Sequence, residues 1–279
     1  EDGIGGENEL RIAAAESITI DNTVTGNVSV VSTNDLATTV DIDLAGVGES
    51  ELVHNGTGLL TVDNVTTADG DVILMSESAV TVANGGITVG GANRDAHLTT
   101  TGQDAGLDIE AAITAADDTV FLNIGGAITN DATANTADII ANTLTVSAAT
   151  GIGSDANADP TDTDAGWLDT DVAVINADIS GEAFVREADN VTMGTVNADL
   201  DSGSHFALHS AAGSILLGTV DIAQGIATLD ADGSINDAAA DDIVDLTAEV
   251  VDLDANDGIG ETETVEVSAV TITANQNDG

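Results

Sequence analysis

The chain has no cysteine, no tyrosine, one proline and one tryptophan among its 279 residues. Without cysteine it can contain neither a disulfide framework nor a thiol nucleophile, although this absence is compatible with export and with an intracellular location. Aromatic residues make up only 1% of the chain, yet 42% of its residues are hydrophobic. A core of this size usually relies on large aromatic side chains. The sequence therefore predicts an interior built from Ala, Val, Ile and Leu.

Basic residues are equally scarce. Three Arg and no Lys stand against 50 acidic residues, for a formal net charge of −47. Nucleic acids and anionic membranes are bound through Lys and Arg, so this balance argues against both as partners. No run approaches the ~20 apolar residues of a membrane-spanning helix, and we expect no membrane insertion. High charge with few aromatics also fits disorder, but the regular spacing of the apolar runs opposes that alternative.

Short β-branched runs recur along the chain, among them "VSVV", "VDIDL", "VILM", "TVFLNI" and "TLTVSA". They are separated by Gly, Asn and Asp, which favour turns because they tolerate positive φ or bond to their own backbone. We find no stretch in which apolar residues keep a helical spacing over three turns. The sequence therefore predicts an all-β protein.

The sequence also contains internal repeats. Residues 126–153 align without a gap on residues 233–260, at an offset of 107 and with a shared closing Gly-Ile-Gly. The residues that follow the second copy align with the opening of the chain, at an offset of about 255. Self-similarity of this kind is typical of repeat architectures. We predict that residues 1–279 form one continuous solenoid, a slice of a longer array with nested periods of about 107 and about 255 residues.

Short strands, small turns and few aromatics together favour a parallel β-solenoid. In such a fold each turn presents a few inward aliphatic residues, and neighbouring turns complete the core and the hydrogen-bond ladder. We expect roughly 20 residues per turn, a length common among solenoid repeats. The alternative is a pair of tandem β-sandwiches, which the low aromatic content and the weak hairpin signals disfavour.

Several phrases resemble the repeats of very large bacterial surface proteins of the filamentous-haemagglutinin type. They include "EADNVTMGTV" (187–196), "AAGSILLGTVDIAQG" (211–225) and "GSINDAA" (233–239). The resemblance lies in the alternation of "G-x-I" turns with short strands and covers most of the chain. It implies a right-handed parallel β-helix, secretion to the bacterial cell surface, and a role in adhesion or surface structure. The secretion-signal domain of that family has no counterpart in this sequence.

The segment "SDANADPTDTDAGWLDTD" breaks the pattern and contains the only Pro and the only Trp. We interpret residues 154–170 as an acidic insertion loop. It is not an EF-hand, because Pro160 and Gly166 stand where that loop requires Gly and a bidentate Glu. Its oxygen-bearing side chains remain candidates for binding Ca²⁺, and the alternative is a solvated acidic turn. The candidate ligands are Asp155, Asn157, Asp159, Asp162 and Asp164, and Trp167 is the candidate residue for binding an external ligand.

A second candidate cation site lies in "DLDANDG" and consists of Asp252, Asp254, Asn256 and Asp257. The net charge of the whole chain is a stronger indication of cation binding than either candidate site. Like charges stacked ~4.8 Å apart repel by about 0.9 kcal/mol per pair in water before screening. We therefore expect stabilisation by cations, with Ca²⁺ as the possible cofactor.

Two other features could suggest a zinc site or an enzymatic activity, but neither interpretation holds. In "HFALH", His205 and His209 share one face of the expected strand but lie about 13 Å apart, too far to bind one zinc ion. Polysaccharide lyases and hydrolases also use β-helices, but a lyase needs a cationic side chain to neutralise a uronate, and this chain has three such residues in all. We expect no enzymatic activity.

The sequence thus favours an extracellular structural protein that forms a fibre, sheath or stalk. Its partners would be copies of itself stacked end to end, or adjacent repeats of the same chain. The alternative is an adhesin segment that binds a surface or a glycan through the loop at 154–170.

Overall fold

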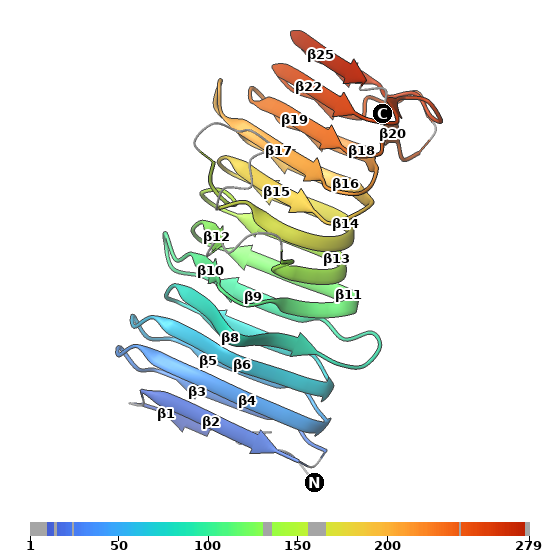
Figure 1. Cartoon of the computed structure of the whole chain (residues 1–279). Coiled ribbons are helices and arrows are strands. Elements are labelled where there is room, and N and C mark those ends of the chain that lie inside the picture. The colour runs from blue at the N-terminus through green and yellow to red at the C-terminus, as the bar shows by residue number, and fades with distance from the viewer. Residues whose placement is uncertain are drawn as a thin grey trace. The chain divides into compact units, whose positions relative to one another are not determined.

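The computed structural model describes residues 10–13, 16–23, 25–130, 136–155, 166–239 and 241–276. Over these residues the chain is all-β and without helix, and its strands stack in parallel to form a β-solenoid of about 11 turns (Figure 1). The predicted fold class is confirmed. Tandem β-sandwiches are excluded for these residues, because sandwich sheets pair their strands antiparallel.

The chain divides into two compact units, each of which is described separately. Unit 1 comprises residues 1–131 and 138–142, and unit 2 comprises residues 132–137 and 143–279. β13 (Ile139–Ala148) is divided between them. The strands of unit 1 are β1 (Leu10–Ile12), β2 (Ser17–Asn22), β3 (Val28–Ser32), β4 (Thr38–Val47), β5 (Ser50–His54), β6 (Leu60–Asp69), β7 (Val72–Ser76), β8 (Val80–Val89), β9 (Ala96–Thr100), β10 (Leu107–Ile109), β11 (Ile113–Ile124) and β12 (Ile128–Asn130).

Unit 2 continues the numbering. Its strands are β14 (Leu168–Ile179), β15 (Ala183–Glu187), β16 (Val191–Ala198), β17 (His205–Ser210), β18 (Ile215–Asp221), β19 (Ile226–Ala231), β20 (Ser234–Asp237), β21 (Leu246–Thr247), β22 (Val250–Ala255), β23 (Gly258–Ile259), β24 (Val267–Ser268) and β25 (Thr271–Gln276). The continuity of one stack through both units stays a prediction from the sequence.

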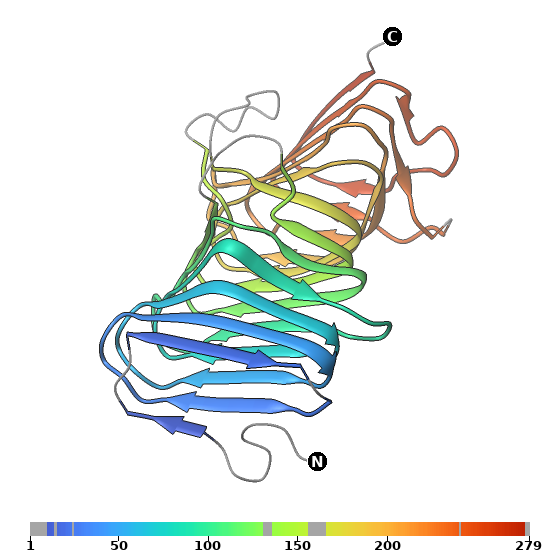
Figure 2. The same cartoon turned by 60° about the horizontal axis from the view of Figure 1, so that its bottom comes forward.

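From β4 to β9, each turn of unit 1 alternates a ten-residue strand with a five-residue strand. Beyond β9, β10 and the first residues of β11 stack on β8, and the end of β11 stacks on β9. The long strands β2, β4, β6 and β8 stack on one another, and the short strands β3, β5, β7 and β9 form the other side (Figure 2). Thr38 pairs with Leu60, Leu60 with Val80, and Val80 with Leu107, so successive turns differ in length. Several turns are therefore longer than the sequence led us to expect, because the corners between strands vary in length.

The core consists of aliphatic columns that run along the stack. Val30, Leu52, Leu74, Leu98 and Leu122 occupy matching positions in five successive turns, and each is at most 2% exposed. Apart from Val31, which is also buried, their strand neighbours are half-buried or exposed, as the alternating burial along β5 illustrates. Burying one such side chain is worth about 1.5–3 kcal/mol. Small aliphatic residues at alternate positions therefore suffice to fill the interior without aromatic residues.

In unit 2 Val185, Leu208, Leu229 and Leu253 form a comparable buried column. Here the alternation is interrupted at β15, all of whose residues are buried, and the aromatic side chains of Trp167, Phe184 and Phe206 are buried as well.

The repeat shared by residues 126–153 and 233–260 is also visible in the backbone. Gly151 and Gly153 have φ of 119° and 65°, and their counterparts in the second copy, Gly258 and Gly260, have φ of 116° and 67°. Both copies thus make the same left-handed turn, a conformation in which glycine is favoured.

The opening and closing segments that align in sequence each form a six-residue strand in their own unit. β2 stacks with β4 in unit 1, and β25 stacks with β22 in unit 2.

Candidate cation-binding sites

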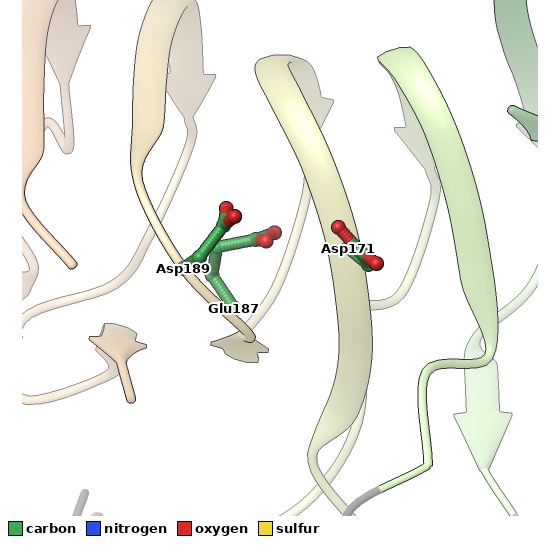
Figure 3. A group of neighbouring side chains, drawn as sticks. All are labelled: Asp171, Glu187 and Asp189. Atoms are coloured by element: carbon green, nitrogen blue, oxygen red, sulfur yellow. The ribbon is translucent and has the colours of Figure 1, made fainter. Parts of the chain in front are cut away.

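Three carboxylates meet in unit 2 at the junction of two neighbouring turns. Asp171 lies on β14, Glu187 ends β15, and Asp189 lies just beyond the end of β15 (Figure 3). Each offers an oxygen atom, and these atoms all lie within 4.8 Å of one another. Glu187 is fully buried, whereas Asp171 and Asp189 are exposed. Carboxylate oxygens at this separation are the ligand type that Ca²⁺ prefers.

The buried member of this cluster is held by its neighbours. Glu187 accepts hydrogen bonds from Thr170 Oγ1 at 2.6 Å and from the backbone N–H of Val172 at 3.1 Å. Loss of solvent raises the pKa of the Glu187 carboxyl to about 7, although these hydrogen bonds act in the opposite direction. The backbone N–H groups of Ala188 and Asp189 also lower this pKa, but loss of solvent has the larger effect.

A small cavity adjoins the cluster. Its volume is about 100 Å³, and its lining includes Asp169, Thr170, Arg186 and Glu187. Arg186 Nη1 donates to Asp169 Oδ1 at 3.2 Å, and both residues are at least nine-tenths buried. The Arg186 guanidinium also lies over the ring of Trp167, 5.6 Å from its centroid. A buried ion pair of this kind needs every partner in place, because removing one leaves an uncompensated charge.

A second cluster of unit 2 joins Asp237, Asp245 and Glu266, again with oxygen atoms within 4.8 Å of one another. Asp237 and Asp245 are each 3% exposed. The backbone N–H of Glu266 donates to Asp245 Oδ2 at 2.8 Å. Burial raises the pKa of the Asp245 carboxyl to about 6, with smaller contributions in the same direction from Asp237 and Glu266.

Most of the ligands expected in the acidic insertion, Asn157, Asp159, Asp162 and Asp164, lie outside the described residues. The base of the loop is described: the backbone N–H of Ser154 donates to the carbonyl of Gly166 at 2.8 Å. Asp155 Oδ2 accepts a hydrogen bond from Trp167 Nε1 at 3.0 Å. One oxygen of Asp155 thus anchors the tryptophan at the foot of the loop.

Trp167 does not present its ring to solvent. It is 2% exposed and packs against Phe184, with ring centroids 5.6 Å apart and planes inclined by 58°. Together with Ala207 these two rings form a buried cluster. The hypothesis that Trp167 contacts an external ligand therefore does not fit this structure. The ring is buried because it fills space between neighbouring turns and satisfies its N–H through Asp155.

The second expected set is spread along the outside of unit 2. Asp252 and Asp254 alternate on β22, and the pKa of Asp252 is raised by burial first and by Asp254 second. Asn256 Nδ2 donates to Asp232 Oδ1 in the preceding turn at 3.1 Å. Among the described residues Asp252, Asp254 and Asp257 do not form a cluster within 4.8 Å.

Many other carboxylates accept a hydrogen bond from a neutral donor in an adjacent turn. Thr66 Oγ1 donates to Asp43 at 2.7 Å, and Asn64 Nδ2 donates to Asp41 at 3.1 Å. Stacking a donor on an acid in this way avoids the repulsion between like charges in matching positions that the sequence argument assumed. The repulsion is therefore concentrated where acids do coincide, as at Asp230 and Asp254.

The two histidines of "HFALH" lie on β17 with separate surroundings. His209 Nδ1 lies 3.2 Å from Asp230 Oδ2, its register neighbour in the next turn. The backbone N–H of His205 donates to Glu182 Oε1 at 3.2 Å. Phe206 and Leu208 are buried.

No known protein family, no curated protein and no solved structure matches the chain. Across the described residues there is no helix long and apolar enough to cross a membrane. The resemblance to filamentous-haemagglutinin-type proteins therefore stays an expectation from the sequence.

Proposed function

We propose that the chain is a structural segment of an extracellular fibre, sheath or stalk on a bacterial cell surface. The observation that carries the proposal is the in-register parallel stacking of similar turns around unbroken aliphatic columns in each unit. Solenoids built in this way are extended by adding turns, and a longer stack of turns makes a longer and stiff rod. The resemblance to giant repetitive surface proteins supports the same role.

The proposal includes the partners expected from the sequence. Adjacent repeats of the same chain, or copies placed end to end, supply the next turn. Nucleic acid binding, membrane insertion and catalysis have no part in it, because a formal charge of −47 with three Arg disfavours anionic ligands.

Cations belong to the proposal as stabilising partners. A net charge of −47 destabilises a compact state by self-repulsion. The two carboxylate clusters, at Glu187 and at Asp245, are the places where acids converge most closely among the described residues. We propose that Ca²⁺ and other cations relieve this repulsion collectively in salty surroundings.

The test is localisation on cells that make the protein. Antibodies raised against the purified chain are applied to intact cells and to permeabilised cells, and the label is viewed by immunogold electron microscopy. The proposal expects label on external fibres or stalks of intact cells, and loss of that label after mild surface proteolysis. Label that appears only after permeabilisation would contradict it.

An adhesin remains the alternative role, because the described residues that flank the acidic insertion form a hydrogen-bonded base, in which Ser154 pairs with Gly166 and Asp155 with Trp167. Replacing residues 156–165 by a Gly-Ser linker of equal length keeps this base intact. An adhesin would lose binding to glycans or surfaces in that variant. A structural segment would keep its fold and its place in the fibre.

A further inference from the structure

One face of unit 1, formed by β5, β7, β9 and β11, carries large apolar side chains at outward positions. Ile73, His97 and Phe121 occupy one outward column in successive turns, and Val53 and Met75 occupy the next. Met75 is 40% exposed, and the other four residues are half-buried. We call these five side chains the apolar patch. Contiguous exposed apolar side chains on a protein surface mark interaction sites.

The apolar patch is a local feature of this face. β5, β7 and β9 each have a neighbouring strand on both sides, so the exposure belongs to the outside of the coil and not to a sheet edge. The opposite face of the same turns is polar. Outward positions of β4 are occupied by Thr39, Asp41 and Asp43, and those of β6 include Thr61 and Thr66.

Carboxylates border the apolar patch on both sides. Asp71 precedes β7 and Glu77 follows it, and the two outward apolar residues of that strand lie between them. The two acids are about 20 Å apart along the strand direction. Asp71 Oδ1 accepts the backbone N–H of Asp95 at 3.1 Å, and Asp95 Oδ1 accepts that of Thr119 at 2.9 Å. These hydrogen bonds hold two carboxylates along one border.

The borders argue against a second copy of the chain as the occupant. A two-fold pairing of this face would bring Asp71 and Glu77 close to the acids of the other copy, and each copy carries a formal charge of −47. The apolar patch itself covers only about 250 Å², estimated from strand spacing and rise. A stable dimer buries about 800 Å² on each partner. The missing area could come only from the acidic borders.

The aromatic rings argue against a glycan. His97 and Phe121 stack on each other, with ring centroids 4.5 Å apart and planes inclined by 4°. Each ring thus covers one face of the other, and Ile73 precedes His97 in the same column. Sugars stack on open ring faces, whereas this column offers ring edges beside aliphatic side chains. Such a relief suits the aliphatic side chains of another protein.

We propose that the apolar patch binds a basic amphipathic helix of a partner protein, laid across β5, β7, β9 and β11. These strands are about 4.8 Å apart, so a helix of about 12 residues spans them. Its apolar stripe would pack on Ile73 and Met75. Lys and Arg on the two sides of the stripe would face Asp71 and Asp95 on one border and Glu77 on the other. The inference does not depend on the proposed cellular role.

The test is fluorescence anisotropy of a labelled peptide titrated with the purified full chain at roughly 0.15 M NaCl, where the Debye length is about 8 Å. The probe is a peptide of about 18 Leu, Ala and Lys residues, whose leucines form one helical stripe between lysines. A second peptide has the same composition in a permuted order without a stripe, so its charge is equal. The chain should bind the amphipathic peptide at least about tenfold more tightly than the permuted one.

Ile73→Thr combined with Met75→Thr should abolish this preference, because it removes the apolar centre and leaves every charge in place. The matched control is Val47→Thr, which removes an exposed aliphatic side chain at the end of β4 and should keep the preference. Glu77→Gln should weaken binding of the amphipathic peptide at least about threefold. Asp43→Asn removes the same charge from the opposite face and should weaken it less.

Circular dichroism checks that the variants stay folded, which is expected because Thr suits outward strand positions. Equal affinity for the two peptides, or a double variant that keeps the preference, would overturn the proposal. Two other results would assign the face to a different occupant and overturn it as well. These are dimerisation of the chain in sedimentation velocity, or binding of cellohexaose, if the double variant abolishes either association.

Discussion

At the scale of single residues, Glu187 is the most deeply buried acidic residue among those that the structure describes. Its pKa is raised by burial to about 7, from an ordinary value of 4.5. Between about pH 4.5 and 7 the folded protein thus holds a proton that the unfolded chain has lost. Its contribution to the free energy of unfolding is fully present below about pH 4.5. It is lost as pH rises through 7, with a magnitude of order 1–3 kcal/mol.

Glu187→Gln should therefore flatten the decline of stability between pH 5 and pH 8. The measurement is urea unfolding at several pH values in the presence of EDTA. Glu77→Gln is the matched control, because Glu77 is exposed. The control should keep the wild-type slope. Parallel curves for wild type and Glu187→Gln would show that the buried carboxyl is not responsible.

Trp167 provides a second test at this scale, because it is the only tryptophan in the chain. Its 2% exposure and its packing against Phe184 predict blue-shifted fluorescence and little quenching by acrylamide in the native state. Unfolding should shift the emission to the red and restore quenching. A native spectrum like that of free tryptophan would mean that the ring is exposed, as an external ligand site would require.

At the scale of elements, one corner of unit 1 is kept tight by a column of glycines. Gly26, Gly48 and Gly70 stand at equal intervals in the sequence, and each donates its N–H to a carbonyl of the next turn. A Cβ added at Gly48 would overlap the carbonyl of Gly26, and one added at Gly70 would overlap the carbonyl of Gly48. The corner thus requires glycine because successive backbones approach so closely.

Gly48→Ala should cost about 2–4 kcal/mol of stability, since the turns must separate to admit the methyl group. Gly203→Ala is the comparison, because Gly203 has a φ of 88° but open space around its Cα. It should cost only about 1–2 kcal/mol, the strain of a left-handed alanine. Denaturant midpoints measure both changes. A larger loss at Gly203 than at Gly48 would contradict the role assigned to close backbone approach.

At the scale of the whole molecule, repulsion among like charges opposes the compact state. Fifty acidic residues against three Arg predict a melting temperature that rises with NaCl and with Ca²⁺. Ca²⁺ at millimolar concentration is compared with NaCl at matched ionic strength, to separate binding from screening. Binding predicts a larger rise with Ca²⁺, and screening alone predicts equal rises. A melting temperature that is unchanged by EDTA and by salt would contradict the proposed role of cations.

The all-β class and the parallel stacking followed from the sequence alone. Val40, Ile42 and Leu44 show why: each is buried, the residues between them are Asp41 and Asp43, and this alternation is a property of consecutive residues. The shortage of aromatics likewise limits the interior to a narrow aliphatic core. Such features can be predicted without knowing which turns are neighbours in the stack.

Only the tertiary structure decided which carboxylates meet. Asp171 lies beside Glu187, and Asp245 lies beside Glu266, because neighbouring turns bring them together. Leu168 pairs with Val185 across a short step in the sequence, whereas Ala227 pairs with Val251 across a longer one, so no fixed spacing reveals these neighbours. The burial of Trp167 was hidden for the same reason. Contacts between turns depend on corner lengths, and corners are where residues are inserted at least energetic cost.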